Sequence, residues 1–210
     1  GLSICDAVEL ADRMNFRRVR LGSLEPDHIT DEVIDRLAKL PSFCPQFHIS
    51  LQSGCNNTLK AMNRHYSAEE YFELCQKLHA SFPEATITTD IMVGFPTESE
   101  EDFAENVRFA QKIGFEKVHV FPYSPREGTK AAKMPQIEKA IKEKRSHIMI
   151  EKTEEIRKIF LESQIGKTVE VLFETRHSDG FAEGYTKNYT PVKVKGELTC
   201  GEISRIKITA

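Results

Sequence analysis

Segments typical of strands and of helices alternate four times along the first 125 residues, and this alternation constrains the fold most. Strand-like segments lie at 16–21, 47–51, 86–93 and 117–121, with apolar residues at helical spacing between them. Each strand–helix unit spans about 30–40 residues, enough for parallel strands joined by a helix. The pattern predicts an α/β fold with a parallel sheet, either part of a (β/α) barrel or an open doubly wound sheet.

Four strands are too few to close an eight-stranded barrel. The sequence also begins with Gly1 and not with Met. We therefore expect that this chain starts inside a longer protein and that the missing strands lie upstream.

Local signals define several helix ends. Ser67 with Glu70 predicts a capping box, and Thr97 with Glu100 predicts a second one. Gly114 is a suitable residue to end the helix that the second box begins.

The pattern changes after residue 135. Residues 136–164 have apolar positions near helical spacing and no internal Pro or Gly, which predicts one long charged helix or two helices with a bend. Short alternating segments follow at 168–174, 181–185, 190–194 and 202–208. We predict two domains, one at residues 1–164 and a small all-β barrel or sandwich at 165–210.

Charge and cysteine content narrow the setting. The chain has 29 Lys and Arg against 32 Asp and Glu, but residues 1–125 carry a balance of −7 and residues 126–210 one of +4. The basic second part is either ordinary solvated surface or a contact for an anionic partner, with nucleic acid the first candidate. No apolar run reaches the roughly 18–20 residues of a membrane span, so we expect no membrane partner. The five scattered cysteines predict a reducing, cytoplasmic setting and form no zinc or iron–sulfur motif.

Several sequence strings identify a family. They are RLGSLEP at 20–26, HISLQSG at 48–54, MNRHY at 62–66, TDIMVGFPTESEEDF at 89–103 and FPYSPREGT at 121–129. Together they resemble the radical-SAM methylthiotransferases, and GYTKNY at 184–189 with GEI at 201–203 resembles the RNA-binding TRAM domain of that family. The SLEP string is most similar to the branch that modifies threonylcarbamoyladenosine beside the tRNA anticodon. The sister branches act on isopentenyladenosine in tRNA or on a ribosomal protein.

The resemblance implies a cofactor and partners. The family uses S-adenosylmethionine and two 4Fe-4S clusters to add a methylthio group to C2 of the adenine base, and its RNA partner is the tRNA anticodon stem-loop. One cluster is held by a C-x-x-x-C-x-x-C loop, which this sequence lacks. We therefore expect that this chain holds neither cluster and does not turn over alone, and we expect no DNA partner.

The resemblance also implies cofactor-binding residues near the carboxyl ends of the strands, where parallel sheets carry their sites. Amide and hydroxyl groups suit ribose hydroxyls, a glycine at 54 lets a ligand approach the backbone, and a guanidinium suits the methionine carboxylate. Ion pairing is the alternative for the arginine, and core packing is the alternative for the apolar residues. The candidates are Gln52, Ser53, Arg64, Ile91, Gly94 and Phe121.

Other residues are candidates for substrate binding. Glu25 ends the first strand region and is expected to recognise the threonylcarbamoyl group or to order the cofactor. In the C-terminal domain, cations and stackable rings suit RNA, although a solvated surface is the alternative. These candidates are Arg176, Tyr185, Lys187 and Tyr189. We interpret the mid-strand residues His48 and His119 as structural.

Three functions remain open from the sequence. The chain is the catalytic-core part of a tRNA methylthiotransferase, a non-catalytic RNA-binding module, or an unrelated barrel enzyme such as an aldolase. An aldolase needs a buried strand lysine as its nucleophile. Lys117 is the only lysine next to a strand of the first domain and begins that strand, which disfavours this function.

Overall fold

The computed structural model describes residues 3–196 and 198–210 and contains two sheets. The first is parallel, with strands β1 (Ser23–Leu24), β2 (Gln46–Ile49), β3 (Thr86–Val93) and β4 (Lys117–Pro122) side by side in chain order. The helices are α1 (Ile4–Arg13), α2 (Asp31–Ala38), α3 (Asn56–Ala61), α4 (Ala68–Ser81), α5 (Glu100–Ile113) and α6 (Lys139–Glu162), with 3₁₀ turns at Pro26–His28 and Ala131–Lys133. The predicted α/β class is confirmed.

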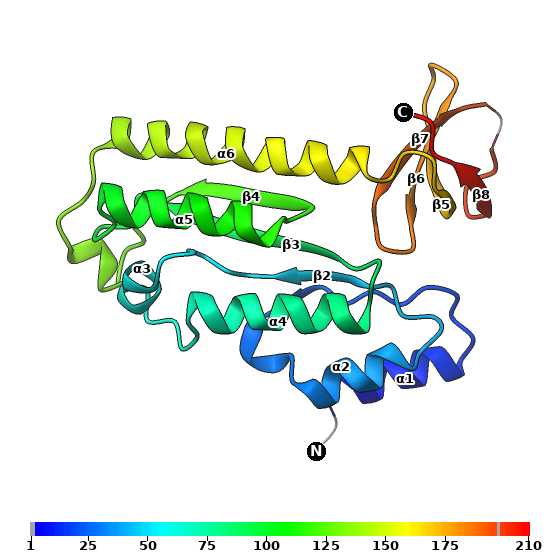
Figure 1. Ribbon diagram of the computed structural model, residues 1–210, viewed down its shortest axis with the longest axis horizontal. Coiled ribbons are helices and arrows are strands. Elements are labelled where there is room, and N and C mark those ends of the chain that lie inside the picture. Colours follow the sequence, from blue (N-terminus) through cyan, green and yellow to red (C-terminus); the bar gives the residue numbers. More distant parts are fainter. Residues whose placement is uncertain (1–2, 197) are drawn as a thin grey trace.

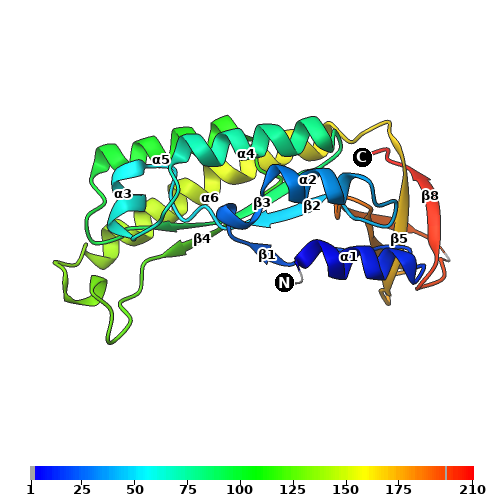
Figure 2. The same cartoon turned by 90° about the horizontal axis from the view of Figure 1, so that it is seen from below.

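The helices leave one face of the parallel sheet open. Helices α4, α5 and α6 lie together on the other face (Figures 1 and 2). Successive strand residues point to opposite faces. In β3 the side chains of Ile87, Ile91 and Val93 are therefore buried against the helices, whereas Asp90 and Met92 are half-buried on the open face.

The first predicted strand is wrong in position. In the region 16–21, pairing is limited to an isolated bridge between Val19 and Phe43, and the paired strand is β1 at Ser23–Leu24. The two arginines that flank Val19 instead turn to other partners. Arg18 donates to main-chain carbonyls of the second sheet, and Arg20 donates to the side chain of Gln46.

One capping box is confirmed and the other is shifted. Ser67 and Glu70 cap α4 as predicted, and Gly114 ends α5 in the left-handed conformation with φ of 75°. The cap of α5 is Ser99, which forms the box with Asp102 two residues beyond the predicted pair. Glu98 turns inward at this point, so the chain enters the helix only after it.

The second sheet forms the β domain. Its strands β5 (Thr168–Arg176), β6 (Phe181–Thr186), β7 (Pro191–Lys195) and β8 (Ile203–Lys207) are antiparallel, in the order β7-β6-β5-β8. They surround a small core of Val171, Phe173, Ala182 and Val192. The predicted all-β segment after the helix is confirmed.

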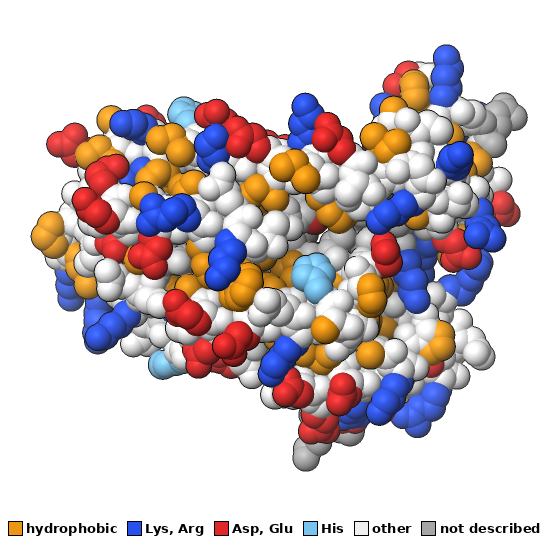
Figure 3. Space-filling view, viewed as in Figure 1, with side chains coloured by type: hydrophobic (Ala, Val, Ile, Leu, Met, Phe, Trp, Pro, Cys, Tyr) orange, Lys and Arg blue, Asp and Glu red, His pale blue; other side chains and the backbone are white. Residues whose placement is uncertain are grey.

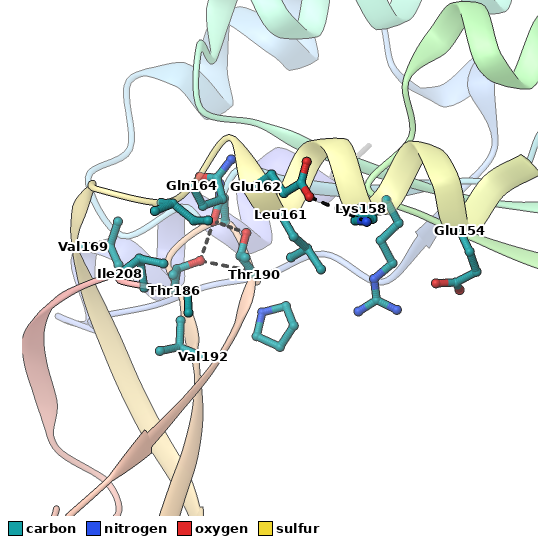
Figure 4. A pocket seen from close by; sticks show the side chains of 15 residues that line it. Glu154, Lys158, Leu161, Glu162, Gln164, Val169, Thr186, Thr190, Val192 and Ile208 are labelled. Carbon is teal, nitrogen blue, oxygen red and sulfur yellow. Dashed lines mark hydrogen bonds and ion pairs between the residues drawn. The ribbon is translucent and has the colours of Figure 1, made fainter.

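Helix α6 is continuous and connects the two sheets. At its C-terminal end Leu161 faces Val169, Val192 and Ile208 of the β domain across a pocket of about 420 Å³ (Figure 4). No helix in the described part of the chain has the length and apolar character that crossing a bilayer requires.

Candidate functional site at the carboxyl edge of the parallel sheet

The loops that follow the four parallel strands meet at one edge of the sheet. Main-chain hydrogen bonds join the first loop residue after one strand to the last residue of the neighbouring strand: Ser50 donates to Leu24 at 3.3 Å, and Tyr123 donates to Val93 at 2.8 Å. Gln52 forms a bridge with Ile91. The structure therefore brings the loops of Glu25, Gln52 and Gly94 to the same edge.

Gln52 has an unusual backbone that fixes this edge. Its φ of 67° lies in the left-handed region, which a non-glycine residue adopts only at a cost. The N–H of Gln52 donates to Asp90 at 2.8 Å, and its carbonyl accepts from Met92 at 2.9 Å. The side chain is only half-buried, so its amide is available to a ligand.

Ser53 and Gly54 face inward, away from solvent. Ser53 is fully buried and its hydroxyl accepts from the N–H of Cys55 at 3.2 Å. A Cβ on Gly54 would lie 2.5 Å from the Cβ of Phe109 on α5. The expectation that Gly54 admits a ligand is therefore wrong, because the space is needed for a helix.

The carboxylate of Asp102 holds the loop of Ser53 and Gly54 in place through hydrogen bonds to the residues that follow it. This carboxylate accepts hydrogen bonds from the N–H of Ser99, from Asn57 and from the thiol of Cys55. Burial opposes ionisation of this carboxyl, but the hydrogen bonds outweigh it and lower its pKa to about 2. Burial raises the pKa of Cys55 to about 11, so this thiol is not a reactive nucleophile.

The loop after β3 is fixed by α6. Gly94 has φ of 72°, and a Cβ there would collide with the Lys142 side chain of α6. Its N–H donates to the carboxylate of Glu98 at 2.6 Å, which in turn binds Arg145 at 2.8 Å. The backbone of Gly94 is therefore covered and not open as expected from the sequence.

Glu25 and Arg64 are partners. The guanidinium of Arg64 lies 3.3 Å from the carboxylate of Glu25, and both side chains are partly exposed. Tyr66 holds the Arg64 segment on the edge, because its hydroxyl donates to the carbonyls of Ser50 and Leu51. The predicted cofactor ligand and the predicted substrate ligand thus meet as an ion pair.

The two apolar candidates lie on opposite faces. Ile91 is 0% exposed in the core against the helices, so its side chain offers no ligand contact. Phe121 is 51% exposed on the open face, next to its strand neighbour Met92. This exposed ring gives the edge an apolar surface suited to an adenine base.

A polar row on the open face was missed by the sequence analysis. His48 contacts Thr88 at 3.0 Å and Asp90 at 3.3 Å, and its ring lies 6.0 Å from that of His119. Burial lowers the pKa of His119. The signal was the two-residue alternation of β2, β3 and β4, which puts these side chains on one face.

The β-domain candidates lie at the other end of the sheet. Lys187 donates to the carbonyl of Pro41, and the ring of Tyr189 lies under the guanidinium of Arg20 and stacks on Tyr185. Arg176 lies at the end of β5. The described contacts therefore put Tyr185, Lys187 and Tyr189 at the amino edge, away from Gln52.

The described residues do not fit an iron–sulfur cluster. Four of the five cysteines are buried at separate places, and across residues 3–196 and 198–210 no group of three His, Cys, Asp or Glu is arranged to hold a metal ion. The edge does offer the amide of Gln52, the guanidinium of Arg64 and the ring of Phe121, which fit the polar and aromatic parts of a nucleoside.

Charge does not distinguish the helix-covered face. Acidic and basic side chains are interspersed across it (Figure 3). This mixture is typical of ordinary solvated surface. The edges and the open face of the sheet are therefore the better candidates for a binding site.

Known proteins match both parts of the chain. The model of the Radical SAM superfamily matches residues 6–110, half of the chain, and that of the TRAM domain matches residues 162–210. A Bacillus subtilis protein named Threonylcarbamoyladenosine tRNA methylthiotransferase MtaB is 36% identical over 91% of this chain and 44% of its own length. A Mycobacteroides abscessus protein named tRNA-2-methylthio-N(6)-dimethylallyladenosine synthase is 38% identical over 92% of this chain and 41% of its own length.

A solved structure agrees with the fold. Coproporphyrinogen III oxidase (HemN) from Escherichia coli, described as a Radical SAM enzyme, has a TM-score of 0.54 at 13% identity, over 87% of this chain and 51% of that chain. The chain spans less than half the length of the two curated relatives. The resemblance in the sequence strings is confirmed, and the chain belongs to the Radical SAM superfamily.

Proposed function

We propose that this chain is the part of a tRNA methylthiotransferase that binds S-adenosylmethionine and RNA. The full protein adds a methylthio group to C2 of N6-threonylcarbamoyladenosine next to the anticodon, in the cytoplasm. The observation that carries the proposal is the convergence of the family strings on one edge of the parallel sheet in a chain 36% identical to a relative of that name.

The carboxyl edge supplies the cofactor contacts. S-adenosylmethionine bound there would supply the radical chemistry that acts on C2 of the adenine base, and a second molecule of it would supply the methyl group. The exposed ring of Phe121 packs against the adenine, and the amide of Gln52 binds the ribose hydroxyls. Arg64 binds the methionine carboxylate. Ser53, Ile91 and Gly94 act indirectly, because their buried positions shape the loops that carry these contacts.

Glu25 acts on the substrate side. Its carboxylate orients Arg64 through the ion pair and keeps further lone pairs for the threonylcarbamoyl group.

The 210-residue chain alone is inactive in this proposal. Its cysteines do not fit a cluster, so the two 4Fe-4S clusters of the family belong to other parts of the protein. Turnover by this chain alone would contradict this part of the proposal.

Nucleoside analysis of tRNA tests the function. Mass spectrometry compares tRNA from cells with and without the gene, and a plasmid copy of the full gene is the control. Loss of the methylthio group from threonylcarbamoyladenosine supports the proposal.

The same experiment tests a second candidate. The 38% identity to a dimethylallyladenosine synthase favours loss from isopentenyladenosine instead. Mass spectrometry of the ribosomal proteins from the same cells completes the test: if only a ribosomal protein loses its methylthio group, the tRNA assignment is wrong. Unchanged modification in all three would leave a non-catalytic RNA-binding module.

A further inference from the structure

A polar groove lies at the amino edge of the parallel sheet, at the opposite end from the carboxyl-edge site. It has a volume of about 490 Å³ and lies between the open face of the sheet and the β domain. Figure 2 shows the β domain beyond the amino ends of the strands. We call this polar groove the amino-edge groove. It is defined by Arg20, Gln46, Lys117, Arg157, Tyr185 and Tyr189.

Three cations line this groove from three different elements. Arg20 precedes β1, donates to Gln46 at 2.9 Å and lies over the ring of Tyr189 at 4.3 Å. Lys117 begins β4, and Arg157 comes from α6. Their convergence depends on the packing of the β domain and α6 against the sheet, so the groove exists only in the folded chain.

Two of these cations lack strong partners. Within residues 3–196 and 198–210, the side chain of Lys117 makes no hydrogen bond or ion pair, although its charge favours ionisation of the neighbouring Glu116 carboxyl. Among the described residues, Arg157 reaches only the carboxylate of Glu116, at 3.9 Å, and its buried Nε has no hydrogen-bond partner. A cation that lines a groove without a partner keeps its donors for a ligand.

Two carboxylates also line the groove but do not cancel the cations. Glu183 binds His177 at 3.0 Å. Glu116 is only 7% exposed, and burial raises its pKa. The three cations therefore exceed the two carboxylates in number, and both carboxylates already face a partner, Glu183 with His177 and Glu116 with Arg157.

The aromatic residues restrict the ligand further. Tyr189 stacks on Tyr185 with ring centroids 4.2 Å apart and planes 7° apart, while Arg20 covers its other face. Both faces of Tyr189 are occupied, so this ring offers no platform for a base. The remaining donors of Arg20, Lys117 and Arg157 match phosphate oxygens.

We propose that the amino-edge groove binds a phosphate group of an RNA strand that continues from the β domain. The proposal rests on the proposed function only for the choice of RNA as the source of the phosphate. The groove lies at the other end of the sheet from the carboxyl edge, so it anchors a part of the RNA remote from the modified base.

Binding of a fluorescent anticodon stem-loop to the 210-residue chain tests the proposal. Affinity is measured by anisotropy at several salt concentrations for the wild type, Lys117→Gln, Lys117→Arg and Lys139→Gln. Lys139 is the matched control, because its side chain is 89% exposed at the far end of α6.

Loss of one phosphate contact has a defined signature. We expect Lys117→Gln to weaken binding about three- to tenfold at low salt and to reduce the slope of log K against log salt by about 1. Lys117→Arg retains the charge and should restore both values, and Lys139→Gln should match the wild type. A variant that merely folds poorly would lose affinity without changing the slope of log K against log salt. As a second measurement, the ring NMR signals of His48 and His119, which line the groove, should shift on titration with RNA.

Each outcome decides one part of the proposal. If the wild type binds RNA and Lys117→Gln binds it with the same affinity and slope, the groove proposal is wrong and the RNA function stands. A parallel calorimetric titration uses AMP and inorganic pyrophosphate. If these bind in a Lys117-dependent way and RNA does not bind, the groove takes a free nucleotide, and the proposal that the phosphate group comes from RNA is wrong. If no probe binds the wild type, the phosphate site is overturned.

Discussion

Arg145 of α6 holds the carboxylate of Glu98 at 2.8 Å beneath the loop that follows β3. The same carboxylate accepts from the N–H of Gly94, and both charged side chains are almost completely buried. Arg145 also binds the main-chain carbonyl of Glu98 and the carboxylate of Glu100. A helix that runs from the carboxyl edge to the β domain thereby fixes one of the site loops.

Breaking this buried pair should destabilise the chain strongly. Arg145→Met leaves Glu98 buried without its cation, and we expect the free energy of unfolding to fall by about 3–5 kcal/mol. Urea denaturation followed by circular dichroism measures it. The double variant Arg145→Met with Glu98→Gln should recover part of the loss, and a single variant as stable as wild type would contradict this account.

Gly54 should tolerate no side chain. Gly54→Ala places a Cβ against Phe109, and we expect a loss of about 1–3 kcal/mol from overpacking. Gly22→Ala is the matched control, because no heavy atom of the described residues lies within 4 Å of a Cβ built there. Thermal denaturation compares the two variants, and equal melting temperatures would show that α5 can shift to make room.

The helix caps show how far the sequence could predict the fold. Ser67 and Glu70 are local partners, so the sequence sufficed to identify their box. The pairs Thr97–Glu100 and Ser99–Asp102 both satisfy the same spacing. The choice between them depends on Glu98, whose partner Arg145 is 47 residues away in the chain, and no local pattern contains that information.

The carboxyl-edge site likewise has features that the sequence predicts and features that depend on long-range packing. Parallel topology was enough to predict that Gln52 and Gly94 share an edge. It did not predict that Gly94 is covered by Lys142, or that Tyr189 is stacked beneath Arg20. Those contacts join elements far apart in the sequence, and they follow from how α6 and the β domain pack.

The Glu25–Arg64 pair should separate cofactor binding from turnover. If Arg64 binds the methionine carboxylate as we propose, Arg64→Met in the full-length protein removes that contact, and KM for S-adenosylmethionine should rise about tenfold with kcat little changed. Steady-state kinetics with the exposed control Arg108→Met measures this. If KM does not change, Arg64 serves only as the ion-pair partner of Glu25.

Glu25 itself is tested by Glu25→Gln in the same enzyme. The amide keeps the shape of the side chain but removes the charge that orients Arg64. We expect a lower rate of modification of the threonylcarbamoyl substrate, about tenfold, since a charge-assisted hydrogen bond is replaced by a neutral one. Unchanged tRNA binding and rate would overturn the assignment of Glu25 to the substrate side.

Asp102 should make stability depend on pH in the acid range. Its folded pKa of about 2 lies below the ordinary value of 3.8 for an aspartic acid, so its contribution to stability is present above about pH 4 and is lost as the pH falls towards 2. The shift corresponds to about 2 kcal/mol.

Asp102→Asn should therefore have a lower free energy of unfolding than the wild type at pH 7, and this difference should shrink between pH 4 and 2. Urea denaturation at pH 7, 5, 4 and 3 measures this, with Asp35→Asn on the exposed face of α2 as the control. A difference that stays constant over this range would mean that the Asp102 carboxylate contributes through its shape and not through its charge.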